Sequence, residues 1–283
     1  MDKNIPDKIL QEVSIFPSMP KAGMKLRSLL AKEDVSVAEI EKILRQDPGL
    51  AANVLRLANS PFFGLPSKVG TLKHAVTLLG VKRFSKIAVG ACMDKTMDVA
   101  VPGYGLSQGK LWLHSIAVSN TAEALARYRK LDEAGDYFTP ALLHDLGKLV
   151  LAHFVNRARP EIDELLSKGV PLVIAEKEIL GTDHAEIGAL ILSKWSFPKD
   201  LINAVRWHHY PEAMADSGLH SEIVYLANLM CQSNSGGESA GDQPNEPYSS
   251  VLERLGLKPE QYFKFAEKTR SWQEKLSETL VLE

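Results

Sequence analysis

Five histidines and one aspartate in the second half of the chain are candidates for a metal site. They are His114, His144, Asp145, His184, His208 and His209. Imidazole nitrogens and carboxylate oxygens are donors that suit iron, zinc, manganese and nickel. Because neighbouring residues on a helix diverge by about 100°, the pair His144 and Asp145 cannot chelate one ion without help. Further donors must come from other elements, and the six together could hold one ion, or two ions bridged by Asp145.

Two ions held in this way would permit chemistry on phosphate esters. Divalent ions about 3.5–4 Å apart can clamp an in-line phosphoryl displacement and supply a hydroxide at neutral pH. Lys148 follows His144 by one helical turn and is a candidate contact for a phosphate oxygen. The alternative is a hydrogen-bonded polar network that keeps the same side chains together without a metal. The residue types alone leave both interpretations open.

The elements that must position these side chains are predicted to be helices. Apolar residues recur at helical spacing almost everywhere, and no alternating strand pattern is present, which predicts an all-α fold. Ser36 and Glu39 form a capping box before one helix, and Asp47-Pro48 begins another. His114 is expected within a helix over 107–129, and His144 with Asp145 within helical residues 137–155. Asp183 caps a helix that has His184 in its first turn, and a further helix leads from Pro198 to His208 and His209.

The break at Val101–Gly105 predicts two helical lobes that meet near residues 96–107. The expected domains are an N-terminal helical lobe over 1–100 and a helical bundle with C-terminal helices over 106–283. Phe62 and Phe63 are expected to fold back on the core. The polar, glycine-rich segment 233–242 is predicted to be a mobile loop.

Composition excludes some classes of partner. The net charge of the 283-residue chain is -2, so no basic surface for nucleic acid or an anionic membrane is expected. No apolar run approaches the ~20 residues of a membrane span, and no secretory signal is visible. The two cysteines, Cys92 and Cys231, form no metal or redox motif, which favours a cytoplasmic location.

Several motifs resemble one known family. They are Phe16-Pro17-Ser18-Met19-Pro20, Asp47-Pro48-Gly49-Leu50-Ala51, Leu55-Arg56-Leu57-Ala58-Asn59-Ser60 and Thr77-Leu78-Leu79-Gly80. Over roughly residues 12–210 the chain resembles the HDOD domain (HD-related output domain) of the HD phosphohydrolase superfamily. The pattern of His114, His144-Asp145, His184 and His208-His209 is also similar to the HD-GYP branch, whose members bind two or three metals and hydrolyse cyclic di-GMP. The resemblance implies an all-helical fold with an HD-type bundle, and a bacterial signalling or regulatory role.

Three departures from the HD-GYP pattern argue against hydrolysis. Lys110 stands where that branch has a glutamate, Asn228 stands where the family has its last aspartate, and Tyr210-Pro211 lacks the glycine-tyrosine-proline signature. An amide is a weak neutral ligand, and a lysine repels a metal.

The favoured function is therefore that of a cytoplasmic signal-transduction protein that binds a protein partner, with one or two iron, zinc, manganese or nickel ions in a degenerate HD site. We expect it to act as a standalone adaptor, without nucleic-acid or membrane binding, and we make no prediction of its oligomeric state. The alternative is an enzyme, a metal-dependent phosphohydrolase or phosphodiesterase of HD-GYP type that acts on a cyclic dinucleotide. For that alternative the ligands would be His114, His144, Asp145, His184, His208 and His209, and no catalytic residue is assigned beyond the candidate phosphate contact Lys148.

Overall fold

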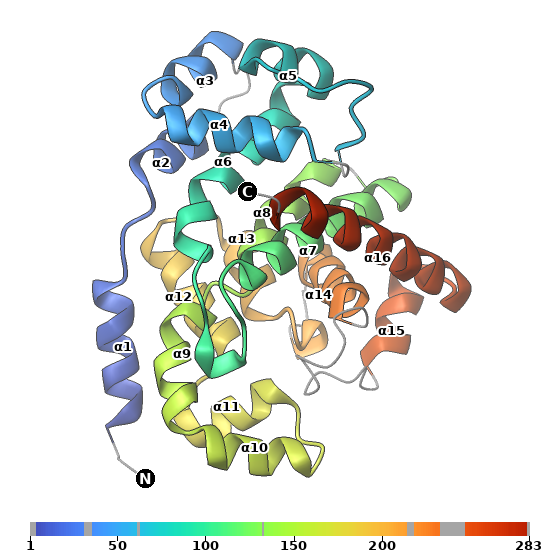
Figure 1. Ribbon diagram of the computed structural model, residues 1–283. Coiled ribbons are helices and arrows are strands. Elements are labelled where there is room, and N and C mark those ends of the chain that lie inside the picture. The colour runs from blue at the N-terminus through green and yellow to red at the C-terminus, as the bar shows by residue number, and fades with distance from the viewer. Residues whose placement is uncertain are drawn as a thin grey trace. The chain divides into compact units, whose positions relative to one another are not determined.

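The computed structural model describes residues 4–30, 36–60, 63–131, 133–213, 218–232 and 247–281. Over these residues the chain is helical, and the one β-type pairing is an isolated bridge between Val101 and Leu106 (Figure 1). The predicted all-α fold is confirmed. The predicted loop over 233–242 lies outside the described residues.

The chain divides into two compact units. Unit 1 comprises the residues up to Pro17 together with Asp98–Ser271, and unit 2 comprises Ser18–Met97 and the residues from Trp272 onward. The N-terminal lobe was predicted to span residues 1–100. In the structure, the residues up to Pro17 belong to unit 1, together with the later part of the chain. That the two units are separate domains stays a prediction.

The described residues of unit 2 between 18 and 97 form the α-helices α2 (Lys21–Leu30), α3 (Val37–Leu44), α4 (Pro48–Ala58), α5 (Leu72–Leu79) and α6 (Val81–Met97). The sequence signals for helix starts are present as side-chain caps. Ser36 Oγ accepts from the Glu39 backbone N–H at 3.2 Å, and Asp47 Oδ1 accepts from the Leu50 N–H at 3.0 Å. Phe63 is 8% exposed and lies under the Arg83 guanidinium, 5.0 Å from the ring centroid. The inward orientation expected of Phe63 is thus observed, while Phe62 lies outside the described residues.

Unit 1 holds the remaining elements, except that the part of the last helix from Trp272 onward is assigned to unit 2. They are α1 (Ile5–Ile15), η2 (Pro102–Tyr104), α7 (Lys110–Tyr128), η3 (Ala134–Tyr137), α8 (Phe138–Leu143), α9 (Lys148–Arg157), α10 (Arg159–Ser167), α11 (Leu172–Leu180), α12 (His184–Lys194), α13 (Lys199–Arg206), η4 (Pro211–Ala213), α14 (Leu219–Gln232), α15 (Pro247–Arg254) and α16 (Pro259–Val281). The helices α7 and α14 pack on each other at its centre and are buried along most of their length. Helices apolar on more than one face are typical of such central positions.

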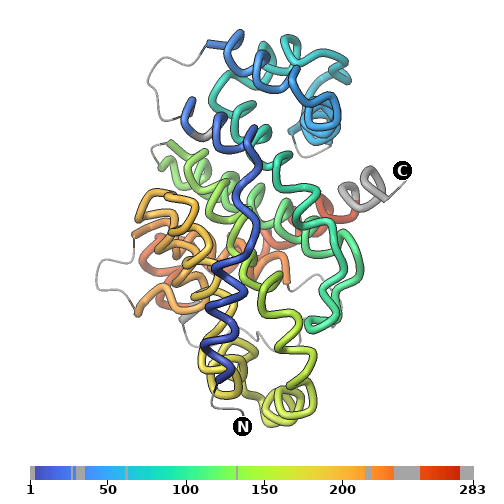
Figure 2. The backbone as a smooth tube through the Cα atoms, turned by 90° about the vertical axis from the view of Figure 1, so that its left-hand side faces the viewer, coloured from blue at the N-terminus to red at the C-terminus, as the bar shows by residue number. Residues whose placement is uncertain are grey.

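The helix α1 is fixed to unit 1 through the C-terminal end of α12. Lys194 Nζ donates to the carbonyl oxygens of Val13, Ser14 and Phe16, at 3.2, 2.6 and 2.9 Å. These carbonyls at the end of a helix have no intrahelical partner, so a lysine is a favourable cap there. The tube in Figure 2 shows α1 running along this unit, where it packs on α9 and α12.

The segment 137–155 differs from its expected form, because it is not one continuous helix. The helix α8 ends at Leu143 and α9 begins at Lys148, so His144 and Asp145 stand in the turn between them. The turn is closed by short-range bonds from the Leu146 N–H to the Leu143 carbonyl and from the Lys148 N–H to the Asp145 carbonyl. Such i→i+3 bonds tighten the chain and re-aim its side chains.

Candidate metal centre

All six candidate ligands belong to unit 1 and lie together at its centre. His114 comes from α7, His144 and Asp145 from the turn before α9, and His184 is the first residue of α12. His208 and His209 follow the end of α13. The side chains of His144, His184 and His208 are fully buried, Asp145 is 1% exposed, and the His114 side chain is 20% exposed. The structure therefore brings together every residue that was predicted for the site; that they bind a metal stays a prediction.

Asp145 is the hub of this arrangement. Its Oδ1 lies 3.4 Å from His184 Nε2 and 4.0 Å from His208 Nε2. Its Oδ2 lies 3.3 Å from His144 Nε2 and 3.7 Å from His114 Nε2, and it accepts a hydrogen bond from Lys148 Nζ at 2.8 Å. A single carboxylate is thus surrounded by four imidazoles from four separate elements, as in the metal sites of helical bundles.

Backbone carbonyls fix the tautomers of two histidines. His144 Nδ1 donates to the Ala141 carbonyl and His208 Nδ1 donates to the Val205 carbonyl, each at 2.7 Å. The Nε2 lone pairs of both rings consequently point at the hub. Among the described residues these two Nε2 atoms and Asp145 Oδ1 have no hydrogen-bond partner although they are buried. Buried acceptors without donors are costly in a protein interior, and a cation is the group that would satisfy all three.

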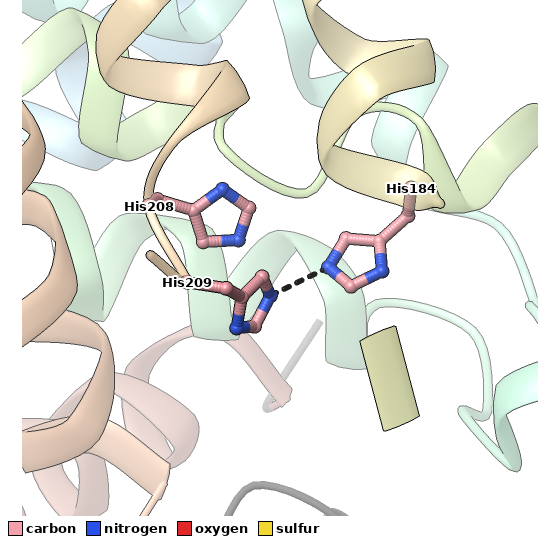
Figure 3. A group of neighbouring side chains, drawn as sticks. All are labelled: His184, His208 and His209. Carbon is pink, nitrogen blue, oxygen red and sulfur yellow. Dashed lines mark hydrogen bonds between the residues drawn. The ribbon is translucent and has the colours of Figure 1, made fainter. Parts of the chain in front are cut away.

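Two groups of three donors are close enough to hold an ion. His184, His208 and His209 form one group, and His114, His144 and Asp145 form the other, with the donor atoms of each within 4.8 Å of one another. In Figure 3 a ring nitrogen of His184, from α12, points toward a ring nitrogen of His209, from the segment after α13. The two Nε2 atoms are 2.9 Å apart, and the ring planes are perpendicular. Two facing ring nitrogens need a shared proton or a shared cation.

His184 is supported from behind by two residues that sequence reasoning missed. Glu176 Oε2 accepts from His184 Nδ1 at 2.7 Å and from the His184 backbone N–H at 2.9 Å. Its Oε1 accepts from the Tyr104 hydroxyl at 2.7 Å. A glutamate at an inward position of α11, beside Val173, Ala175 and Leu180, was the available signal. Tyr104 was hidden in the segment interpreted as a break.

A family model for the HDOD domain matches residues 16–211, well over half of the chain. The chain belongs to the HDOD domain family. This confirms the resemblance drawn from the motifs. The link to the HD superfamily and to its HD-GYP branch stays a prediction.

Solved structures share this HDOD fold. An HDOD domain protein of unknown function from Geobacter sulfurreducens is 22% identical, with a TM-score of 0.81 and 98% of this chain and 97% of that one covered. A candidate phosphohydrolase from Shewanella amazonensis is 24% identical, with a TM-score of 0.75 and 96% and 97% covered. An uncharacterised protein from Treponema pallidum is 24% identical over 229 residues, and the chain spans 43% of that relative's length.

Electrostatics in the HDOD centre favour uncharged rings at His114, His208 and His209. Burial lowers the pKa of His114 to about 3, and burial with the neighbouring imidazoles holds the pKa of His208 and His209 well below the ordinary value. Burial also opposes the charged form of Asp145, but His144 and Lys148 outweigh it and hold that carboxyl's pKa well below its usual range. Neutral rings at His114, His208 and His209 and an ionised Asp145 carboxylate are protonation states that favour metal binding.

His184 differs from the other rings in the cluster. Burial lowers the pKa of His184, but the charge and the hydrogen bond of the Glu176 carboxylate, together with the charge of Asp145, raise it, and the net pKa is raised. The Glu176 carboxyl, whose own burial opposes its charge, has a lowered pKa because His184 is beside it. The Glu176 carboxyl is therefore ionised where it contacts the His184 imidazole.

The candidate phosphate contact Lys148 and two of the residues that depart from the HD-GYP pattern, Asn228 and Lys110, have separate positions. Lys148 pairs with Asp145, lies 5.5 Å from the Tyr104 ring centroid and is 11% exposed at its side chain; contact with a phosphate stays a prediction. Asn228 Oδ1 lies 3.0 Å from His114 Nε2. Lys110 is exposed at the first position of α7, one turn before His114.

The other histidines stand apart from this HDOD site. His74 and His153 are exposed, and His220 stacks on Tyr137 with ring centroids 4.4 Å apart.

In the part of the chain that is described, no helix combines the length and apolarity that crossing a membrane requires.

Proposed function

We propose that this HDOD protein is a bacterial signalling regulator that acts by binding another protein, and that its buried centre holds one divalent ion. The ion would be iron, zinc, manganese or nickel, which are the metals suited to several imidazoles and one carboxylate. We place the protein in the cytoplasm, in keeping with its two cysteines, Cys92 and Cys231, which form no metal or redox motif.

The observation that carries this proposal is the ammonium group of Lys148 beside the Asp145 carboxylate. Lys148 Nζ lies 2.8 Å from Asp145 Oδ2, which is the oxygen nearest to His114 and His144. Asp145 is the one carboxylate in the two candidate metal groups of the described chain. A second dication beside it would face a lysine ammonium at short range, and like charges in a buried place repel strongly.

Asn228 adds to the same argument. It occupies a position next to His114 Nε2 where a carboxylate would supply the negative charge that a second ion needs. An amide oxygen is neutral and binds such ions weakly. One ion held by imidazoles and Asp145 Oδ1 is therefore the best-supported occupancy, and it would stabilise the bundle rather than clamp a phosphate.

Metal analysis beside a hydrolysis assay tests this proposal. Protein produced with added iron, zinc and manganese should contain about one equivalent of metal, and His144→Ala should contain none. Neither protein should cleave bis(p-nitrophenyl) phosphate above a metal-only blank. Two bound ions together with hydrolysis that His144→Ala abolishes would overturn the regulator and establish a phosphohydrolase.

The phosphohydrolase stays the second candidate because one observation favours it. All six donors converge, and the Nε2 atoms of His144 and His208 are held toward the hub without a hydrogen-bond partner in the described chain. If the assay succeeds, a cyclic dinucleotide is the substrate to test first. The protein partner of the regulator is to be sought on the exposed face of unit 2, where Met24 and Leu78 are 39% and 40% exposed.

A further inference from the structure

We propose that Glu176 is the second carboxylate of the metal centre and acts through His184 as a positioning residue, with Tyr104 holding Glu176 in place. This inference rests on the metal centre proposed above. It names a residue outside the set of direct ligands that decides how tightly the ion is held.

The geometry of Glu176 is specific to this task. The side chain is fully buried in α11, and both of its oxygens are used. One oxygen accepts from the ring and the backbone of His184, and the other accepts from the Tyr104 hydroxyl. Burying an ionised carboxylate without a cation destabilises the folded protein. For a purely structural role, an amide or an apolar residue would destabilise it less.

The consequence for His184 is a fixed ring and a fixed tautomer. Because Nδ1 carries the proton that Glu176 accepts, Nε2 presents its lone pair to the hub, 3.4 Å from Asp145 Oδ1 and 2.9 Å from His209 Nε2. A carboxylate behind a metal-ligating imidazole also increases the electron density at the ligating nitrogen. Glu176 thus orients the ligand and strengthens it.

The charge balance of the centre gives Glu176 a further role. The Lys148 ammonium offsets the Asp145 carboxylate, and Asn228 contributes no charge beside His114. A divalent ion among the imidazoles would otherwise add positive charge to a buried place with little compensation. Glu176 supplies a negative charge on the side of His184, one imidazole away from the ion.

The local backbone supports this placement from two sides. Asp183 caps α12 by accepting from the Glu186 N–H at 2.8 Å, which fixes the first turn that carries His184. Gly103 sits so close to α9 that a Cβ there would overlap the Ala152 carbonyl oxygen, and this contact fixes Tyr104 against Glu176. The segment expected as a break between lobes is therefore a packed part of the site.

Zinc and cobalt binding by the full-length protein tests the inference. Glu176→Gln keeps the shape and the acceptor for His184 but removes the charge. We expect its Zn²⁺ affinity, measured by competition with a chromophoric chelator, to fall by about 10–100-fold. The visible spectrum of its Co²⁺ form should also change, because the ligand field of His184 weakens. Glu178→Gln is the matched control, an exposed glutamate on the same helix, and should bind as the wild type does.

Tyr104→Phe supplies the second variant. It leaves the carboxylate charged but removes one of its three hydrogen bonds, so a several-fold weaker Zn²⁺ affinity is expected with the Co²⁺ spectrum retained. If Glu176→Gln does not fold, as judged by circular dichroism, Tyr104→Phe decides. Its unchanged affinity would then overturn the inference.

The outcomes separate this inference from the proposed function. A merely structural Glu176 would lower the unfolding midpoint of the EDTA-treated protein and leave both the Zn²⁺ affinity and the Co²⁺ spectrum as in the wild type. That result overturns the positioning role and leaves the metal centre intact. If the wild-type protein binds Zn²⁺ no better than His144→Ala does, the metal centre and the role of Glu176 fail together.

Discussion

At the scale of single residues, replacing Lys148 is expected to destabilise the metal-free protein more than the metal-bound protein. Its ammonium is 2.8 Å from Asp145 Oδ2, in a place where both side chains are nearly buried. Breaking a buried ion pair by removing one partner costs roughly 3–5 kcal/mol, because a charge is left uncompensated. A divalent ion at the hub would compensate that charge instead.

Lys148→Met is therefore expected to lose about 3–5 kcal/mol of unfolding free energy in EDTA and clearly less in excess Zn²⁺. Urea denaturation under both conditions measures the difference. Lys168→Met is the control, because its ion pair with Glu164 is 60% and 68% exposed and such pairs contribute little. Equal losses with and without Zn²⁺ would show that the ion does not replace the ammonium.

We expect Asn228 to limit the centre to one ion, because its amide is neutral. Asn228→Asp places a carboxylate 3.0 Å from His114 Nε2, where it supplies the charge that a second ion needs. We expect the metal content to rise from about one toward two equivalents, as measured by mass spectrometry of the metal after dialysis. Asn156→Asp, an exposed amide on α9, should leave the content unchanged. An unchanged content in Asn228→Asp would contradict the charge argument for one ion.

At the scale of elements, the contact between the His144–Gly147 turn and the first turn of α12 brings the two halves of the site together. A Cβ at Gly147 would overlap the His184 carbonyl oxygen and lie 2.6 Å from the Gly188 backbone nitrogen. Only glycine permits this approach, and it sets the distance between Asp145 and His184. The contact between this turn and α12 therefore positions Asp145 and His184 relative to each other.

Gly147→Ala should force α12 away from the turn. Overpacking of this kind costs about 1–3 kcal/mol, sometimes more, so we expect a lower urea midpoint together with weaker Zn²⁺ binding. Gly70→Ala is the control, since no heavy atom lies within 4 Å of its Cβ position. A variant with wild-type stability and wild-type Zn²⁺ affinity would show that the close approach is unnecessary.

At the scale of the whole molecule, the buried histidines couple stability to pH. His114, His208 and His209 have lowered pKa values, and the pKa of His114 is about 3. Below the unfolded pKa of about 6.5 the unfolded chain binds protons at these rings and the folded chain does not. His184, whose pKa is raised, acts in the opposite direction, and its contribution is present below about pH 6.5 and lost above its folded pKa.

The pKa of His220 is also lowered by burial, so four lowered rings outweigh the single raised one, and the EDTA-treated protein should lose unfolding free energy as pH falls from 7 to 5. Urea midpoints at several pH values measure the slope. His208→Gln should make the slope shallower because one of the four lowered rings is gone. A stability that rises on acidification over this range would show that the rings are protonated in the folded state.

The sequence by itself determined the features that depend on local rules. These features depend only on a few neighbouring residues. They are the helical spacing, the caps at Ser36 and Asp47, and the donor types of His144 and Asp145. The donor types and their helix positions suggested the grouping of the distant histidines, and the family resemblance supported it. These features were therefore open to prediction without coordinates.

Only the tertiary structure decided what surrounds the ligands. Tyr104 and Glu176 are 72 residues apart, and His114 and Asn228 are 114 apart, yet each pair shares a hydrogen bond. Likewise the turn at His144 was hidden in an apolar run that looks helical, because the close contact of Gly147 with α12 is made by a distant segment. Which helix faces meet is set by long-range packing, and no spacing rule along the chain encodes it.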